Sequence, residues 1–382
     1  MKKPPADFTS KVYYRACCLA LFFVAAAASF NGYFEKWHFL DADKYGFTQG
    51  KCYFEPMVDG TATRPYVYRQ LLPMVANWID GRVGQQTRDR LWDKFDYETD
   101  PLQHNAYHPY DSPVAQNRIY FLRYRIVHMA VFLFAWIATL ALYLVGKTVG
   151  FPPVAAALAA VGTILVLPYF FSVAGYYYDY PELAFLALAV WMALKFDWWW
   201  IIPVAALATW NKESFLLFIP ALYPLLRLRS SRLNALAGTA VLGIVCAGVY
   251  CLIWLHFRHN PGGTVEFHFL DQLQFMRDPS NLLARERTYG LTAFKSFSLL
   301  PLALIVWTAW RGWRSLPRAV QRHAQIAAAI NFPLFLLFCA PGELRDLSLL
   351  YVTLLLLLAA NITAWMQRPD NRASGNALAA EP

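Results

Sequence analysis

The sequence predicts an all-α fold, a polytopic transmembrane helical bundle of about ten spans that forms a single integral membrane domain over residues 1–382. Of the 382 residues, 58% are apolar and only 15% are charged, which leaves too few charges to cover a water-soluble protein of this length. Apolar stretches approaching the roughly 20 residues that cross a bilayer recur along the whole chain, so no large soluble domain remains. The clearest are residues 16–29, 130–145, 154–171, 233–254 and 347–365.

Lysine and arginine residues orient these segments, because basic residues in short connections are retained on the cytoplasmic side of a membrane. With ten spans, each of the basic groups in the short connections named below falls on the same side as both ends of the chain. We therefore expect cytoplasmic termini, with residues 367–382 as a cytoplasmic tail. The net charge of +9 needs no nucleic-acid partner, since the basic residues form no continuous stripe. The orienting residues are Lys2, Lys3, Lys11, Arg15, Lys147, Lys195, Arg227, Arg229, Arg232, Arg311, Arg314, Arg318, Arg322, Arg368 and Arg372.

Two of the expected spans are short. Residues 198–226 hold two apolar segments of about 13 residues on either side of Asn211, Lys212 and Glu213. A re-entrant or broken hairpin with its charged tip on the far side preserves the alternation, and such a tip is tolerated only where protein or a wet cavity surrounds it. The span at 181–194 is also short, and it gains length if it extends back through the preceding tyrosines.

The side opposite the termini receives the two long loops, residues 33–117 and 256–290, and two short turns around Asp179 and Glu343. The first loop contains an amphipathic pattern that predicts an interfacial helix lying on the membrane, interrupted near Pro65 and Pro73. The apolar positions of this pattern are Tyr68, Leu71, Leu72, Val75 and Ile79.

Five groups of ionisable residues lie on this same side, and such groups at or within apolar spans are candidate functional sites. The first is Asp41 and Asp43, whose carboxylates could share a divalent cation, or act as a general base and its orienting partner. A solvated loop is the alternative. The second is Arg64 and Arg69, whose guanidinium groups suit phosphate oxygens. Snorkelling to lipid headgroups is the alternative for this pair.

The remaining three groups occupy short turns. Asp179 stands among tyrosines 176–180, which suits either an aromatic interface belt with a helix cap or a sugar-binding surface. Lys212 and Glu213 at the hairpin tip either pair with each other or meet an anionic phosphate. The turn at 343–346 contains Glu343 and Arg345, which either form a local ion pair or bind phosphate or an acceptor.

The pattern resembles the membrane glycosyltransferases of the GT-C superfamily, which combine many spans, a long first extracytoplasmic loop and acidic residues soon after the first span. Residues 64–73 (RPYVYRQLLP), 211–213 (NKE) and 342–345 (GELR) are also similar to motifs of bacterial membrane proteins of cell-surface glycopolymer formation. The chain departs from some relatives in lacking a sizeable C-terminal soluble domain.

The resemblance implies a multi-pass protein of the bacterial cytoplasmic (inner) membrane that transfers a sugar from a polyprenyl-phosphate donor to a glycan, lipid or protein acceptor on the extracytoplasmic face. Membrane lipids would surround it, and the cofactor it leaves open is a divalent cation at Asp41 and Asp43. A transporter or flippase for a lipid-linked sugar or small anion, or a non-catalytic partner in glycan assembly, are the alternatives. In the GT-C reading, Asp41 or Asp43 is the catalytic carboxylate. The expected substrate-binding residues are Arg64, Tyr68, Arg69, Asp179, Lys212, Glu213, Glu343 and Arg345.

Overall fold

The computed structural model describes residues 6–34, 36, 54–94, 114, 117–171 and 175–367, and helices dominate this part of the chain. Five of them are long and apolar enough to cross a membrane, which confirms an all-α membrane protein. Their bounds are α1 (Ala6–Phe34), α5 (Phe121–Val149), α6 (Pro153–Phe170), α10 (Arg232–Phe257) and α14 (Tyr351–Met366), which continues from the 3-10 helix η6 (Leu344–Leu350).

The other expected spans are also helical, but each of these helices is shorter or less apolar than the first five. The count of about ten crossings therefore stays a prediction. These helices are α7 (Asp179–Lys195), α8 (Ile202–Asn211), α9 (Phe215–Leu226), α12 (Leu299–Trp313) and α13 (Arg318–Phe338).

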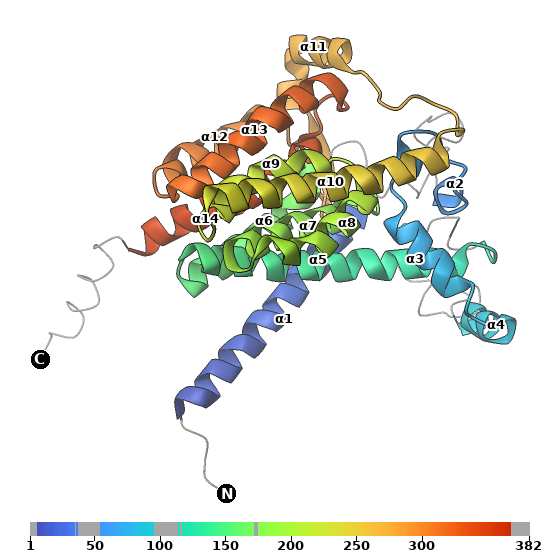
Figure 1. The fold of residues 1–382 in the computed structure, drawn as a ribbon, viewed down its shortest axis with the longest axis horizontal. Helices are drawn as coiled ribbons and strands as arrows, with labels where there is room; N and C mark the ends of the chain where they lie inside the picture. Colours follow the sequence, from blue (N-terminus) through green and yellow to red (C-terminus); the bar gives the residue numbers. More distant parts are fainter. Residues whose placement is uncertain are drawn as a thin grey trace, which may run out of the picture.

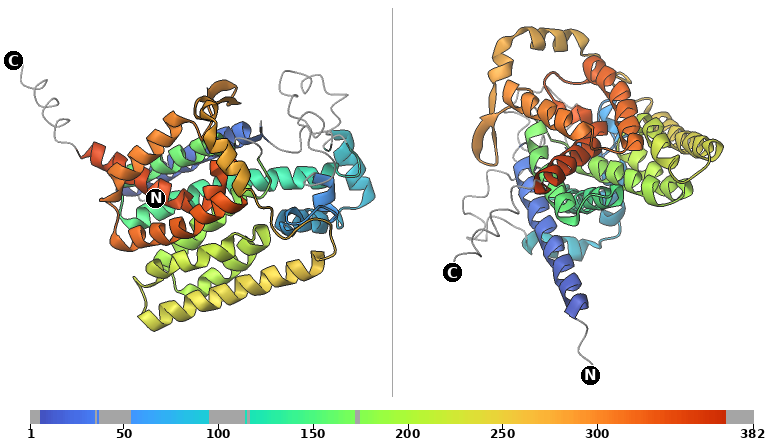
Figure 2. Two further views of the ribbon diagram at one scale, coloured as in Figure 1. Left: turned by 90° about the horizontal axis from the view of Figure 1, so that it is seen from above. Right: turned by 90° about the vertical axis from the view of Figure 1, so that its left-hand side faces the viewer.

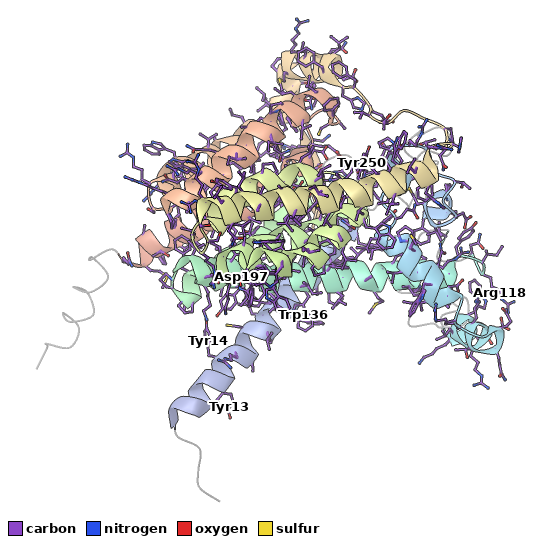
Figure 3. The ribbon with its side chains drawn as sticks, in the orientation of Figure 1. Tyr13, Tyr14, Arg118, Trp136, Asp197 and Tyr250 are labelled. Carbon is purple, nitrogen blue, oxygen red and sulfur yellow. The ribbon has the colours of Figure 1, made fainter. Side chains whose placement is uncertain are left out.

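The helices form one elongated bundle, with α5 and α10 lying along its length (Figure 1). The start of α1 and the end of α14 lie toward one end of the bundle, and α3 and α4 of the first loop lie at the other. Tyr13 lies near the outer end of α1, on the part of that helix that extends away from the bundle, whereas Arg118 lies beside α4 (Figure 3). Helix α10 occupies an edge (Figure 2), and its exposed Leu233, Ile244 and Leu252 give it an apolar outer surface suited to lipid.

Helix α7 lies at the centre of the bundle, where it packs against α5, α8 and α9. Because α7 is apolar around its circumference, burial on all sides stabilises it. Its alanines, among them Ala184 and Ala187, are fully buried and allow neighbouring helices to approach closely. Small residues also allow α5 and α6 to approach closely, since a Cβ atom at Gly146 would lie 3.0 Å from Ala156 Cβ.

Helices α8 and α9 form the short hairpin that the sequence predicts, with the 3-10 helix η4 (Trp198–Ile201) before it. Lys212 has an extended backbone, φ −158° and ψ 128°, which ends α8. The charged tip is therefore a turn placed between two apolar helices.

The described part of the first loop contains α2 (Phe54–Val58), the 3-10 helix η1 (Tyr66–Tyr68), α3 (Leu71–Asp80) and α4 (Gln85–Lys94). The expected interfacial helix is α3, which begins at Leu71, so Tyr68 lies in the preceding η1 and the interruption falls between them. Helix α3 packs against α5, and its Leu71 and Leu72 are buried, whereas Val75 is exposed and does not share their buried face. Met74, Val75 and Trp78 instead form an outward apolar surface.

The second loop contains α11 (Phe269–Arg277), the 3-10 helix η5 (Pro279–Leu283) and an antiparallel hairpin of β1 (Arg285–Thr288) and β2 (Leu291–Phe294) that the all-α prediction does not include. Tyr289 and Gly290, both with positive φ, make the two-residue turn, as short hairpin turns require. The hairpin contacts α6, because the Tyr289 hydroxyl donates to the Leu165 carbonyl. It also contacts α1 and the segment just after it, since the Tyr289 ring lies against Gly32 and Lys36 Nζ lies 2.6 Å from Glu286 Oε1.

Candidate charged site

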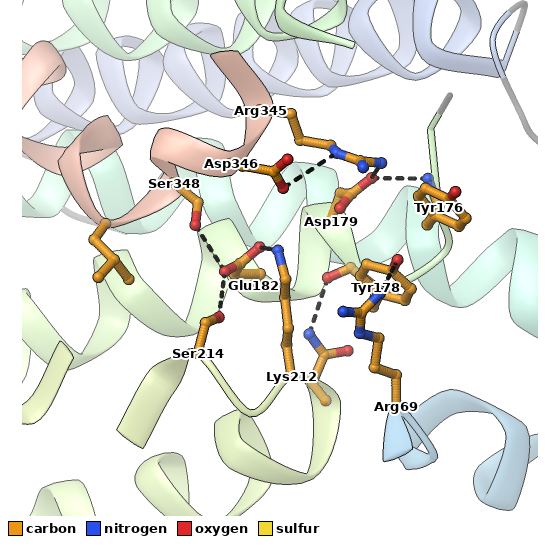
Figure 4. A network of polar contacts seen from close by, with 12 residues as sticks. Arg69, Tyr176, Tyr178, Asp179, Glu182, Lys212, Ser214, Arg345, Asp346 and Ser348 are labelled. Carbon is orange, nitrogen blue, oxygen red and sulfur yellow. Dashed lines mark hydrogen bonds and ion pairs between the residues drawn. The ribbon is translucent and has the colours of Figure 1, made fainter. Parts of the chain in front are cut away.

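Four segments far apart in the sequence bring their ionisable residues together at the end of the bundle where α7 begins (Figure 4). They are the residue after η1, the start of α7, the turn between α8 and α9, and the start of η6. We call this set the charged cluster. It consists of Arg69, Asp179, Glu182, Lys212, Glu213, Glu343, Arg345 and Asp346.

Lys212 pairs with Glu182, one helical turn after Asp179 on α7. The Lys212 Nζ atom lies 2.7 Å from Glu182 Oε2, and both side chains are buried. The second Glu182 oxygen accepts hydrogen bonds from Ser214 Oγ at 2.9 Å and Ser348 Oγ at 2.8 Å. Burial alone would lower the pKa of Lys212, but Glu182 and further carboxylates outweigh burial and raise it, so this residue is charged.

Arg345 lies among three carboxylates. Its Nη2 is 2.7 Å from Glu343 Oε2, its Nη1 is 3.7 Å from Asp179 Oδ2, and its Nε is 3.7 Å from Asp346 Oδ1. The local ion pair with Glu343 that the sequence left open is therefore present. The contact between Arg345 and Asp179 connects this ion pair to the start of α7.

Arg69 reaches into the cluster from the first loop. Its Nη2 lies 3.1 Å from Glu213 Oε1, and its Nη1 donates to the Tyr178 hydroxyl. The Tyr177 hydroxyl donates to the Arg69 carbonyl at 2.8 Å, which fixes the backbone. Burial opposes ionisation of Glu213, but the Arg69 guanidinium outweighs it and holds the pKa of that carboxyl below its usual value.

The tyrosines before α7 hold these guanidinium groups in place. The rings of Tyr176 and Tyr178 stack with centroids 5.1 Å apart and an interplanar angle of 8°. Arg69 Cζ lies 4.4 Å from the Tyr178 centroid, and Arg345 Cζ lies 4.6 Å from that of Tyr176. Both rings are buried, so neither an interface belt nor an open sugar-stacking surface describes them. They act as supports for cations.

Arg64 and Tyr68 lie beside the cluster. Arg64 Nη2 donates to the Gly262 carbonyl at 2.5 Å, and its backbone N–H donates to the Pro261 carbonyl at 2.8 Å. Among the described residues Arg64 forms no ion pair with a carboxylate. Tyr68 is buried against Tyr250, and burial raises the pKa of its hydroxyl although Arg64 opposes the rise.

The structure thus gathers Arg69, Asp179, Lys212, Glu213 and the pair from the 343–346 turn. Asp41 and Asp43 lie outside the described residues, so their expected roles as base and as cation ligands are not addressed by this geometry. Over the residues the structure does describe, no group of His, Cys, Asp and Glu is arranged to hold a metal ion.

Two features of the cluster differ from the sequence interpretation. Lys212 and Glu213 do not pair with each other, because adjacent residues in the turn point to Glu182 and to Arg69. Glu182 was not among the expected site residues, although its spacing of three from Asp179 on an apolar helix places both carboxylates on one face. The spacing of Asp179 and Glu182 is therefore the sequence feature from which Glu182 could have been predicted as a site residue.

Fold and site together define a helical membrane protein with a buried charged cluster at one end of its bundle. No family model and no curated protein matches the chain.

Proposed function

We propose that the protein is a membrane glycosyltransferase that moves a sugar from a polyprenyl-phosphate donor to a glycan, lipid or protein acceptor on the extracytoplasmic face. The observation that carries this proposal is the charged cluster, built from four segments among apolar helices. Burying so many charges in a membrane protein is costly and is typical of a site that handles a polar ligand. Apolar helices beside a charged cluster suit a substrate with a hydrocarbon tail and a polar head.

Arg64 is suited to the donor phosphate. Its guanidinium has no carboxylate partner among the described residues, and a guanidinium can bind two phosphate oxygens at once. Its neighbour Arg69, by contrast, is bound to Glu213.

The proposed reaction forms a bond from the acceptor oxygen to the anomeric carbon and breaks the bond from that carbon to the phosphate oxygen. The phosphate leaves with the electron pair, and a carboxylate takes the acceptor proton. Asp41 or Asp43 is the proposed base, by resemblance to the GT-C enzymes. Arg64 stabilises the negative charge on the departing phosphate.

Release of lipid phosphate tests this proposal directly. The purified protein in lipid nanodiscs is incubated with radiolabelled polyprenyl-phosphate sugars and a membrane extract as the source of acceptor. We expect lipid-phosphate release and label in the acceptor, both lost in the Arg64→Gln variant and retained in the Arg118→Gln variant. Arg118 is an exposed arginine paired with Asp89 away from the charged cluster. Absence of release with every donor would rule out the enzyme.

The pairing of Arg69, Lys212 and Arg345 with buried carboxylates favours one second candidate, a transporter of a lipid-linked sugar, because charged networks of this kind also line transport pathways. Proteoliposomes containing a fluorescent lipid-linked sugar distinguish the two. Movement of the lipid between leaflets without phosphate release supports the transporter.

A further inference from the structure

Three acceptor oxygens of the site are buried without a hydrogen-bond donor among the described residues: Asp179 Oδ1, Asn211 Oδ1 and Glu213 Oε2. The side chains of Asp179 and Asn211 are almost completely enclosed, at 5% and 1% exposure. Ionised carboxylate and amide oxygens can only accept hydrogen bonds. Because buried polar atoms in native proteins nearly always have partners, these oxygens indicate a ligand that supplies donors.

The second polar atom of each of these side chains is already engaged. Asp179 Oδ2 accepts from the Tyr176 N–H at 2.7 Å, and Glu213 Oε1 accepts from Arg69. Asn211 Nδ2 donates to the Tyr178 carbonyl at 2.9 Å, which orients the amide and leaves its oxygen as the unused atom. Rotating the Asn211 amide would give up its bond to the Tyr178 carbonyl, and rotating either carboxylate only exchanges its two equivalent oxygens. Among the donors of the cluster, Arg69 Nε is also buried without an acceptor in the described part of the chain, and Arg345 Nε lies 3.7 Å from Asp346 Oδ1, so acceptors remain in excess.

The charge balance of the cluster also indicates a ligand that donates hydrogen bonds. Its basic residues, Arg69, Lys212 and Arg345, each have a carboxylate partner. The cluster also contains two more acidic residues than basic ones, so a further anion would be repelled in this enclosed setting. A phosphate is therefore a poor ligand here, whereas an uncharged group rich in hydroxyls matches the free acceptors.

We infer that the charged cluster binds the glycosyl group of the donor through its hydroxyls, which donate to Asp179, Asn211 and Glu213. This inference rests on the proposed function and divides the substrate between two places, with the sugar at the cluster and the phosphate at Arg64. The basic residues of the cluster orient the carboxylates and do not bind phosphate. A protonated amino group on the sugar would meet the same acceptors, and the experiment separates the two donor types.

Two isosteric substitutions reverse the hydrogen bonding of the unused atoms. Asp179→Asn and Glu213→Gln each keep an oxygen for the existing bond and place an NH2 group where the free acceptor stood. Binding of neutral methyl hexosides and methyl glucosaminide is measured by saturation-transfer NMR on the protein in nanodiscs, and binding of inorganic phosphate by the broadening of its phosphorus NMR signal. Glu286→Gln is the matched control, because Glu286 is also held in an ion pair but with Lys36 outside the cluster.

We expect the wild-type protein to bind at least one neutral hexoside, and either variant to bind it at least about tenfold more weakly, while Glu286→Gln matches the wild type. Preference for the glucosaminide identifies the ammonium form of the ligand. Phosphate binding that persists in the Arg64→Gln variant overturns the inference, because phosphate would then occupy the cluster and not Arg64. Equal glycoside binding by the wild type and both variants overturns it as well.

Glycosyl transfer on the same samples distinguishes this inference from the proposed function. Transfer by the wild type together with unchanged glycoside binding in the variants retains the function and overturns the inference. Glycoside binding that depends on Asp179 and Glu213, without transfer from any donor, retains the inference and overturns the function.

Discussion

Lys212 at the tip of the α8–α9 hairpin is neutralised by Glu182 on α7, across 2.7 Å, and not by its neighbour Glu213. The hairpin is thereby fastened to the central helix of the bundle. Two serine hydroxyls complete the bonds of Glu182, so its carboxylate has partners on three sides.

Removing one member of this pair is expected to destabilise the protein more than removing both. Lys212→Met leaves the buried Glu182 uncompensated and should lower the free energy of unfolding by about 3–5 kcal/mol. The double variant Lys212→Met with Glu182→Gln should recover much of that loss, since no unpaired charge remains. Unfolding in denaturant, followed in detergent micelles for all four members of the cycle, measures the coupling. Additive effects would contradict the pairing.

Tyr178 is expected to act mainly through its ring. Tyr178→Phe keeps the face against Arg69 and removes only the hydroxyl that accepts from Arg69, which costs about 0.5–1.5 kcal/mol. Tyr178→Leu should cost more, because the stack with Tyr176 and the support of Arg69 are lost together. Unfolding measurements on both variants make the comparison. A larger loss in the phenylalanine variant would show that the hydroxyl dominates.

Arg64 is expected to matter for ligand binding and little for folding, because no carboxylate of the described chain depends on it. Arg64→Gln should weaken binding of a polyprenyl phosphate by about tenfold or more, the usual cost of losing hydrogen bonds to a charged group. Its melting temperature should fall only slightly, because the substitution removes a hydrogen bond to the Gly262 carbonyl, which costs about 0.5–1.5 kcal/mol. Binding is followed by quenching of tryptophan fluorescence with the lipid titrated into nanodiscs, and Arg118→Gln should bind as the wild type does.

Gly262 holds the segment that carries Arg64. A Cβ atom there would lie 2.6 Å from the Arg64 carbonyl oxygen, and the glycine has φ +96°. Gly262→Ala should therefore lower the free energy of unfolding by about 1–3 kcal/mol. Gly248→Ala in α10 is the matched control, because a Cβ atom there meets nothing within 4 Å and should be neutral or slightly stabilising. Equal behaviour of the two alanine variants would contradict the close approach.

Asp41→Asn and Asp43→Asn, made separately, should distinguish the base from its neighbour. Loss of the base should reduce glycosyl transfer by about 10²–10⁴-fold while donor binding persists. Full transfer by the double variant would remove both residues from the mechanism.

The long apolar helices and the gathering of charges at one end could be predicted from the sequence, because hydrophobic length and the placement of Lys and Arg are local properties. The pairing within the cluster could not. Whether Lys212 meets Glu213 or Glu182 depends on how α7 packs against the α8–α9 turn, and that packing has no sequence signature. The hairpin at 285–294 was also unexpected, since a Tyr-Gly turn between short polar strands gives little signal.

Hydrogen bonds between residues 198 or 200 positions apart join the first loop to the segment just after α10. Asn260 donates to the carbonyls of Gly60 and Ala62, and Arg64 donates to Gly262, a residue 198 positions later. During synthesis, the segment with Arg64 emerges long before α10 is inserted. The first-loop segment with Arg64 thus acquires these contacts only after six further helices, α5 to α10, have been synthesised. Arg345 follows later in the chain and is the last basic residue to join the cluster. A chain that has not yet folded its C-terminal helices therefore has an incomplete charged cluster, in which Asp179 lacks Arg345.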